Sequence, residues 1–240
     1  MKTKLFIIGF HLLSVFTLHA QDTSFATIGI KLGTNLSGLI SQSYIAPWGG
    51  VIKGWNTSPQ YGAIGGIVVD FRVSRSFYVQ PELLVVMKGG VREKQIDLYS
   101  MLSGSTQYTN VTRRCNISLI YVETPIHITG KISLRSGKLF MGIGPYVSCG
   151  IYGRNKSTFW QNKTNITHQV SDEYVSQKVF SGKFKAYNIF DWGISAIAGY
   201  EFKTRIFINL GYSLGMIAIS NESADNTRNT SMNLSVGYKF

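Results

Sequence analysis

The chain ends in a strict alternation of apolar and polar residues. One face of the strand that this pattern predicts, over residues 231–240, carries only apolar side chains: Met232, Leu234, Val236, Tyr238 and Phe240. The positions between them hold Asn, Ser, Gly and Lys. A strand with one wholly apolar face requires an apolar environment on that side, and the rest of the sequence indicates that this environment is lipid.

Seven earlier segments show the same period of two. They cover residues 26–37, 61–72, 77–89, 116–129, 139–152, 190–202 and 206–216. In each segment an apolar set of residues alternates with a second set, which is rich in Gly, Ser and Asn in most segments and carries charged or polar residues such as Gln80, Glu82, Glu123 and His127 in the third and fourth. Each has about ten or more residues, which is the length that a tilted strand needs to cross a hydrocarbon core.

The connections between these segments alternate in length. The short ones are residues 73–76, 130–138 and 203–205, and the long ones are 38–60, 90–115, 153–189 and 217–230. Short turns at one end and long loops at the other are typical of outer-membrane barrels. We therefore expect an all-β protein, an eight-stranded antiparallel up-and-down transmembrane β-barrel with short periplasmic turns, long extracellular loops and both termini in the periplasm. The longest loop has room for a hairpin of its own.

Two other architectures share this pattern. A lipocalin-type soluble barrel points its apolar residues inward, and a two-sheet sandwich buries them between its layers. The polar set here is dominated by small residues, which fit a narrow lumen better than a solvated exterior. Aromatic residues also gather near the strand ends, as the interfacial girdles of membrane barrels require: Phe71, Phe77, Phe190, Trp192, Tyr200, Phe202, Tyr238 and Phe240. Both observations favour the membrane barrel.

Residues 1–21 have the layout of a secretory signal peptide. Lys2 and Lys4 precede an apolar stretch of about fourteen residues, and small or polar residues follow it. The stretch is too short to span a bilayer comfortably, so we expect cleavage near Ala20. The mature domain is then residues 22–240, in the outer membrane of a Gram-negative bacterium, and the formal net charge of +12 falls to about +10. An uncleaved interfacial helix is the alternative.

Cys115 and Cys149 are the only two cysteines of the chain. Two cysteines in an exported protein invite a disulfide, and the predicted hairpin brings their segments side by side. The strand phases argue against the bond, because Cys149 falls on the apolar face and Cys115 on the other. A bulge would change that phase, so the bond stays open at this point.

Five short motifs resemble the PorT-like outer-membrane β-barrel family. They are residues 28–37, 78–84, 121–125, 142–146 and 199–202, which read IGIKLGTNLS, YVQPELL, YVETP, GIGPY and GYEF. The likeness covers essentially the whole mature chain. It implies an eight-stranded barrel of a Gram-negative envelope and, by analogy with the member that gives the family its name, a part in protein secretion to the cell surface. Most members have no assigned activity, and the family offers no catalytic motif to transfer.

The predicted inward positions carry charges of both signs. We expect them to form a polar network across the lumen: Lys31, Asp70, Arg72, Gln80, Glu82, Lys88, Glu123, His127, Asp191, Glu201 and Lys239. One interpretation is a structural plug that fixes strand register and closes the pore. The other is a gated proton or ion path through Glu82, Glu123 and Arg72. Eight strands enclose little more than side chains, which favours the plug.

The sequence offers little for catalysis. Only His127 and His168 remain after the leader, and neither has the Ser and Asp neighbours of a hydrolase site. No spacing of His, Cys and Asp matches a metal site. The Gly-rich runs at residues 62–66 and 142–150 lack the lysine and the helix of a phosphate-binding loop. We therefore expect no enzyme activity, no cofactor and no metal ion.

The long loops are basic, and residues 153–189 carry six Lys or Arg against two acidic residues. A location in the outer membrane makes nucleic acid an improbable partner. The phosphates of lipopolysaccharide are natural counter-charges, and a merely solvated basic loop explains the composition equally well. The other expected partners are membrane lipid, secretion or surface proteins, and the outer-membrane assembly machinery, for which Tyr238 and Phe240 would form the assembly signal.

Three classes of function are compatible with the sequence. The first is a binding, scaffolding or secretion-accessory role through the extracellular loops. The second is a small channel for ions or solutes, and the third is a membrane-embedded enzyme. The sequence favours the first, because a filled lumen leaves the loops as the part of the molecule that meets other molecules.

Overall fold

The computed structural model describes residues 25–41, 44–45, 51–52, 56–102, 105–163, 166–170, 180, 187–220 and 226–240. The expected signal peptide and its cleavage site lie outside these residues. The strands of the main sheet are β1 (Ala26–Ile40), β4 (Asn56–Ser58), β5 (Gln60–Arg72), β6 (Phe77–Leu102), β7 (Ser105–Leu134), β8 (Gly137–Lys163), β9 (Ile166–Val170), β10 (Phe190–Phe202), β11 (Ile206–Gly215) and β12 (Arg228–Lys239). A separate pair is formed by β2 (Tyr44–Ile45) and β3 (Val51–Ile52).

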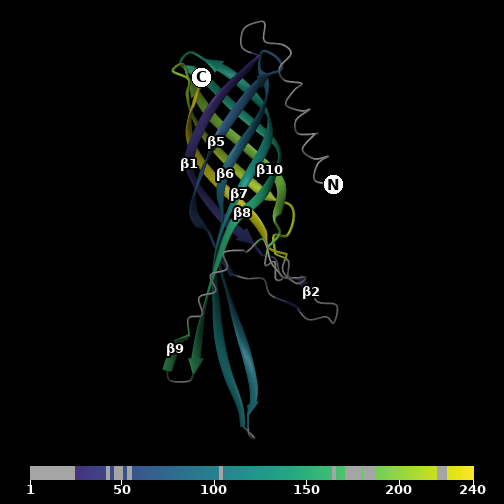
Figure 1. The fold of residues 1–240 in the computed structure, drawn as a ribbon, viewed down its shortest axis with the longest axis vertical. Helices are drawn as coiled ribbons and strands as arrows, with labels where there is room; N and C mark the ends of the chain where they lie inside the picture. The colour runs from purple at the N-terminus through teal and green to yellow at the C-terminus, as the bar shows by residue number, and fades with distance from the viewer. Residues whose placement is uncertain are drawn as a thin grey trace.

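Eight strands close into a barrel (Figure 1). Each of β1, β5, β6, β7, β8, β10, β11 and β12 pairs antiparallel with the next in that order. The ring closes because β12 also pairs with β1, from Lys239 opposite Gly29 to Arg228 opposite Ile40. The all-β, eight-stranded antiparallel barrel expected from the sequence is confirmed.

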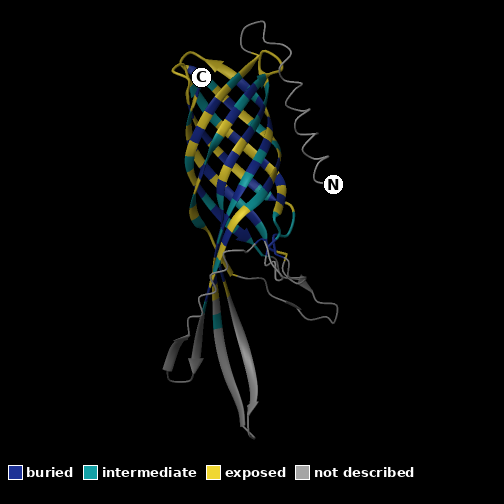
Figure 2. Ribbon diagram, viewed as in Figure 1, coloured by how far each residue is buried: buried dark blue, intermediate teal, exposed yellow. Residues whose placement is uncertain are grey.

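The two faces of the sheet differ in polarity as the alternation predicts. Apolar residues point outward and polar ones inward: Ile128 is 65% exposed, whereas its neighbour His127 is 1% exposed. Figure 2 shows this alternation of exposed and buried positions around the whole barrel wall. A wall of exposed Ile, Leu, Val and Met would be a large apolar surface in water, so its natural solvent is lipid.

The short turns lie at one end of the barrel and the long connections at the other. The turns at 73–76 and 203–205 coincide with the predicted ones, and the turn predicted at 130–138 tightens to residues 135–136. The first residues of β1 and the last residues of β12 lie at this same end, which the sequence predicts to face the periplasm (Figure 1).

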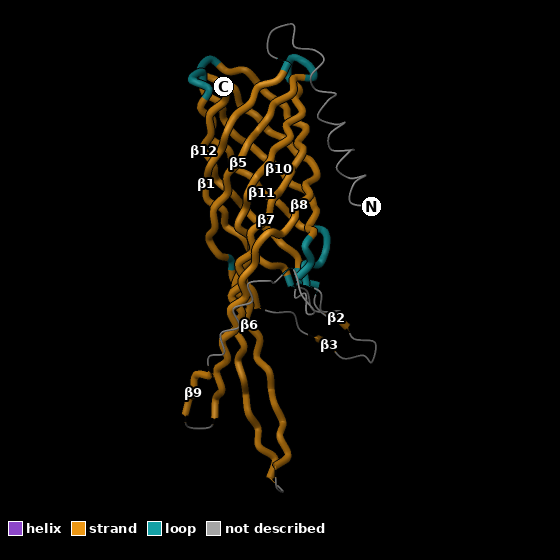
Figure 3. Tube along the Cα trace, in the orientation of Figure 1, coloured by secondary structure: helices purple, strands orange, loops and turns teal. Residues whose placement is uncertain are grey.

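The prediction of a long loop at residues 90–115 is wrong. Residues 90–115 are not a loop, because β6 and β7 stay paired out to Leu102 opposite Ser105 and project from the barrel as a hairpin (Figure 3). Residues 153–189, which have room for a hairpin, do contain one, since the end of β8 pairs with β9 from Phe159–Val170 to Lys163–Ile166.

Two irregularities lie near the extracellular end of the barrel wall. Gly89 of β6 has φ 138°, which L residues with a side chain rarely adopt, and a Cβ there would meet the Ile117 carbonyl oxygen at 2.0 Å. In the neighbouring β7–β8 pair a bulge shifts the register between Ile120 and Tyr121, where Ile151 of β8 has no partner. Bulges bend a strand and increase its twist, so both features suit the point where β6 and β7 approach the extension.

The two cysteines are free, with Cys115 on the inner face and Cys149 on the outer face. Among the described residues, no helix is long and apolar enough to cross a membrane.

Candidate functional site

The lumen holds three groups of buried polar side chains, stacked along the barrel axis. The group nearest the periplasmic turns contains Asp70, Lys131, Glu201 and Lys239. Lys239 Nζ lies 2.5 Å from Asp70 Oδ2 and 2.7 Å from Glu201 Oε2, and Lys131 Nζ bonds to the same two carboxylates. Two cations and two anions therefore neutralise one another in a space nearly closed to solvent. Lys131 also lies over the Tyr78 ring, 4.3 Å from its centroid.

The middle group is built around Glu82. Lys31 Nζ lies 2.5 Å from Glu82 Oε2, and Gln80 Nε2 donates to Glu82 Oε1 at 2.8 Å. His127 Nδ1 lies 3.8 Å from Glu82 Oε1, and its Nε2 forms a 2.7 Å hydrogen bond with the Ser195 hydroxyl. These residues come from β1, β6, β7 and β10, so the group ties together strands on different sides of the barrel.

The upper group is built around Lys88 and Asp191. Lys88 Nζ lies 2.5 Å from Glu123 Oε2 and 3.5 Å from Asp191 Oδ2. Asp191 Oδ2 also accepts hydrogen bonds from the Tyr146 hydroxyl at 3.2 Å and from Asn229 Nδ2 at 3.0 Å. The Lys88 ammonium stacks on the Tyr146 ring, 4.3 Å from its centroid. A single lysine is thus surrounded by two carboxylates and an aromatic face.

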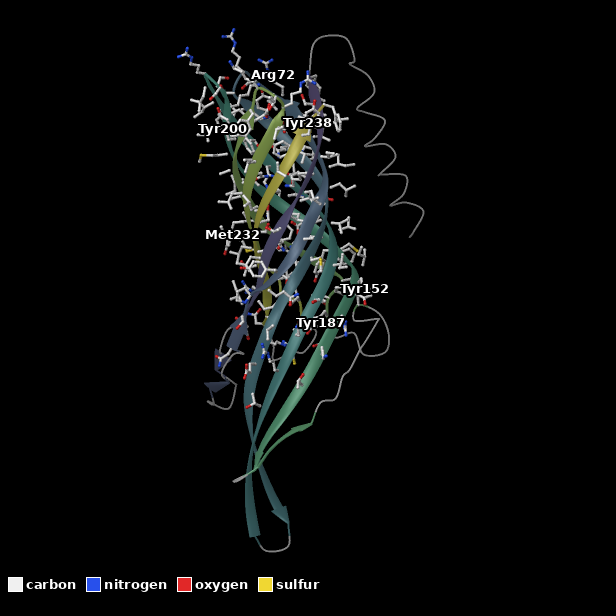
Figure 4. All side chains as sticks on the ribbon, turned by 90° about the vertical axis from the view of Figure 1, so that its left-hand side faces the viewer. Arg72, Tyr152, Tyr187, Tyr200, Met232 and Tyr238 are labelled. Carbon is white, nitrogen blue, oxygen red and sulfur yellow. The ribbon has the colours of Figure 1, made fainter. Side chains whose placement is uncertain are left out.

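An apolar plug closes the extracellular mouth above these groups. It contains Leu39, Cys115, Ile117, Leu119, Tyr121, Phe180, Tyr187 and Ile219. Phe180 comes from the long connection between β8 and β10, and its ring lies 5.6 Å from the Tyr121 ring, centroid to centroid. Gly150 makes room for it, because a Cβ at Gly150 would meet the Phe180 ring at 2.4 Å. The side-chain view in Figure 4 places Tyr187 in this part of the barrel.

Little space is left between the middle and upper groups. A cavity of about 10 Å³ lies there, lined by Glu82, Glu123, His127 and Ser195 among others. One water molecule needs roughly 10–15 Å³, so this cavity holds a single water at most. Paired side chains fill the lumen at this level.

The structure brings together all the expected lumen residues except one. Arg72 is exposed at the periplasmic rim, where its Nε donates to the Ser74 carbonyl at 3.3 Å, so its assignment to the lumen is wrong. The reason is position: Arg72 is the last residue of β5, where the wall gives way to the turn. Figure 4 shows it at that end of the molecule.

Sequence reasoning missed Lys131, Tyr146 and Asn229. Lys131 had a usable signal, because it continues the inward phase of His127 and Thr129, but the strand was ended before it. Tyr146 also lies in the inward phase, between Gly144 and Ser148, but its residue type does not suggest a polar network, and Asn229 lies within residues 217–230, which the sequence predicts as a loop. Tyr238 and Phe240, the expected assembly signal, lie on the outer face and are 42% and 63% exposed.

Glu82, His127 and Ser195 are of the residue types found in a hydrolase triad, but their burial and the small adjoining cavity differ from those of an active site. Ser195 is 4% exposed and faces the inside of the barrel. The adjoining cavity is too small for any substrate larger than water. Among the described residues, no group of three His, Cys, Asp or Glu side chains is placed to hold a metal ion.

Comparison with known proteins gives the family. The model of the outer membrane protein beta-barrel domain family matches residues 19–221. Among curated proteins, no match is found. Solved structures with a similar fold include Neisserial surface protein A (TM-score 0.43, 10% identity, covering 90% of this chain and 99% of that one) and Ail, the attachment invasion locus protein of Yersinia pestis (TM-score 0.37, 12% identity, 90% and 99%). A third is the N-terminal β-barrel domain of Pseudomonas aeruginosa OprF (TM-score 0.25, 11% identity, 88% and 97%).

The family model spans most of the chain, and the closed barrel with its apolar outer wall agrees with it. This chain therefore belongs to the outer membrane protein beta-barrel domain family, whose members lie in the outer membrane of Gram-negative bacteria.

Proposed function

We propose that this protein is a closed barrel that anchors a projecting β-hairpin at the cell surface, where the hairpin binds a partner protein. The observation that carries the proposal is the continuity of β6 and β7. They keep one register, with no shift, from the periplasmic turn at Phe77 opposite Gly130 to the hairpin tip at Leu102 opposite Ser105. A hairpin that continues the barrel wall is held in direction by the barrel itself.

The root of the hairpin is braced on both sides. β4 pairs with β6 from Ser58 opposite Val91 to Asn56 opposite Glu93. β8 pairs with β7 as far as Asn110 opposite Asn162. Beyond Glu93, β6 continues for nine more residues, a length of about 30 Å at the usual rise per residue. A braced arm of this length is suited to reaching a partner beyond the lipid surface.

The filled lumen supports a binding role over the channel. Lys31, Lys88 and Lys131 each bond to a carboxylate inside the barrel, and the apolar plug covers the extracellular mouth. An ion crossing this lumen would have to break several buried pairs, each of which is costly to separate.

We also propose that the chain is a PorT-like member of its family and assists the secretion or surface attachment of other proteins. The motifs YVQPELL and GIGPY support this assignment. The partner surface is then the extracellular hairpin. Lipopolysaccharide and the assembly machinery are proposed as further partners, on the basis of the basic loops and of the aromatic C-terminal strand.

We propose no catalytic role for the Glu82, His127 and Ser195 arrangement. Its contribution is to satisfy buried polar groups and to fix the strands that carry them. Ser195→Ala should leave the cellular function of the protein unchanged, whereas loss of a hydrolase activity on this substitution would overturn the assignment.

Excision of the hairpin tests the main proposal. Glu93 and Arg114 are a cross-strand pair, so residues 94–113 can be replaced by Asn-Gly, which favours a two-residue hairpin turn. We expect this variant to fold, to keep its heat-modifiable mobility on gels and to fail to complement a deletion of the gene. The matched control is an insertion of the same dipeptide directly before Ser105, the first residue of β7, which keeps the arm.

Site-specific photo-crosslinking gives a second readout. A benzoylphenylalanine replaces Tyr99 or Tyr108 on the hairpin, and replaces the outward Tyr212 as control. The proposal expects a discrete protein adduct in cells from the hairpin positions and none from Tyr212. Full complementation by the hairpin-less variant, or adducts at the same frequency from all three positions, would contradict it.

A further inference from the structure

The periplasmic rim of the barrel is strongly cationic. Each of its three short turns carries an exposed arginine, namely Arg75, Arg135 and Arg205. Arg72 and Lys203 are exposed beside them, and no acidic residue lies in turns 73–76, 135–136 or 203–205. The carboxylates of Asp70 and Glu201, in the adjoining strand ends, are bonded to Lys131 and Lys239 in the lumen. The outward charge of this rim is therefore positive.

A groove opens in the outer wall just below one of these turns. It has a volume of about 540 Å³. It exists because Gly130 occupies an outward position between its two cross-strand partners, Phe77 and Met141. A Cβ at Gly130 would meet nothing closer than the Met141 carbonyl oxygen at 4.0 Å. The missing side chain thus leaves a notch in an otherwise continuous apolar surface.

The groove is apolar along its floor and polar at its periplasmic end. Phe77, Ile132 and Met141 line the floor and are 58%, 63% and 61% exposed. Arg75 and Ser76 of the β5–β6 turn line the polar end, together with Ser133. The change from apolar to cationic falls at the last residues of the strands, which is the level at which the hydrocarbon core meets the headgroups.

We propose that this groove binds one phospholipid of the periplasmic leaflet through its phosphodiester. The Arg75 guanidinium and the serine hydroxyls would donate hydrogen bonds to the phosphate oxygens, and an acyl chain would lie in the notch at Gly130. The surrounding rim arginines repel an ammonium group, so the site favours an anionic headgroup such as glycerol over ethanolamine. This inference rests on the outer-membrane location and is independent of the role proposed for the hairpin.

The test is native mass spectrometry of the protein released from micelles that contain one phospholipid at a time. The probes are phosphatidylglycerol and phosphatidylethanolamine with the same acyl chains. We expect wild type to retain one phosphatidylglycerol in clear excess over phosphatidylethanolamine. Glycerol phosphate, which has the headgroup chemistry without acyl chains, serves as a competitor and should not displace the lipid at equal concentration.

Two variants test where the lipid binds, a third tests the charge of residue 75, and a fourth controls for unspecific attraction of the lipid to the cationic rim. Arg75→Ala removes the phosphate donor, and Gly130→Leu places a side chain in the notch, where a Cβ meets nothing closer than the Met141 carbonyl oxygen at 4.0 Å. Arg75→Ala should lower phosphatidylglycerol retention by about tenfold, the usual consequence of losing a hydrogen bond to a charged group. Gly130→Leu should lower it by about tenfold as well, because an acyl chain excluded from the notch loses the burial of a few methylene groups. Arg75→Lys should restore part of it. Lys203→Ala, which removes the same charge at another turn, should bind as wild type does.

Three results would overturn the inference. Wild-type retention by both Arg75→Ala and Gly130→Leu would show that the groove is not the site. An equal loss in Lys203→Ala would show unspecific attraction to the rim, and displacement by glycerol phosphate alone would show a phosphate site without the lipid. Heat-modifiable mobility of each variant on gels establishes that the barrel is folded before binding is compared.

Discussion

At the scale of single residues, small side chains decide which charges meet. Lys31 on β1 and Glu82 on β6 are separated by β5, where Gly66 lies directly opposite Lys31. Because Gly66 has no side chain, the Lys31 chain can extend over β5 and reach the carboxylate at 2.5 Å. A Cβ at Gly66 would also meet the Leu83 carbonyl oxygen at 2.0 Å. Strands β5 and β6 therefore pack more closely at this point than any residue larger than glycine permits.

The Lys31–Glu82 pair allows a double-mutant test of the lumen network. Lys31→Met leaves Glu82 buried without its cation and should destabilise the barrel by about 3–5 kcal/mol, the usual cost of breaking a buried pair. Removing both charges, with Lys31→Met and Glu82→Gln together, should cost clearly less than the sum of the two single changes. Urea unfolding in lipid vesicles, followed by tryptophan fluorescence, gives the free energies. Additive single and double effects would mean that the two residues do not interact.

A second prediction concerns Gly66 itself. Gly66→Val should destabilise the barrel by several kcal/mol, because its Cβ has no room against the β6 backbone and its methyl groups would block the path of Lys31. Gly130→Val is the matched control, since the space around that glycine is open. Equal unfolding free energies for the two variants would contradict the packing described here.

At the scale of the elements, the sequence predicts the barrel wall well and the extension poorly. Each wall strand borders lipid on one side and a polar lumen on the other, which imposes the alternation that reveals its length and phase. Beyond the lipid this contrast disappears, so the sequence KQIDLYSML of residues 94–102 has no regular alternation and reads as a loop. The plug residues Phe180 and Tyr187 were not predicted for a similar reason. They lie outside the regular strands, so no periodic pattern in the sequence indicates that they pack in the barrel.

The plug makes a prediction that uses the native Cys115. This thiol is fully buried in the same cluster as Phe180. In a Cys149→Ser background, Phe180→Ala should raise the rate of Cys115 alkylation by a charged maleimide by about tenfold or more, because truncating a packed Phe typically costs about 3–5 kcal/mol. Tyr212→Ala, on the lipid-facing wall, should leave the rate unchanged. Slow labelling in both variants would mean that Phe180 does not seal the mouth.

At the scale of the whole molecule, the barrel separates two tasks. Its apolar outer wall faces the lipid while the paired charges of the lumen tie the strands together, and in the proposed function its projecting strands carry the surface that meets a partner. The composition of the lumen could be predicted from the inward phase of the strands, because charges of both signs recur there. Their pairing could not be predicted, since it depends on register and on which strands face each other across the barrel. Arg72 shows the limit of the inward phase, because at the last residue of β5 the same phase points to solvent.

Conductance in planar lipid bilayers tests most directly whether the barrel is closed. Purified wild-type protein, inserted from detergent and shown to be folded by its heat-modifiable mobility, should give no current steps above the membrane baseline at either polarity. A known porin in the same bilayers controls for insertion. Reproducible ion-conducting steps from the wild-type protein would contradict the closed lumen, and with it the proposal that the hairpin performs the protein's function.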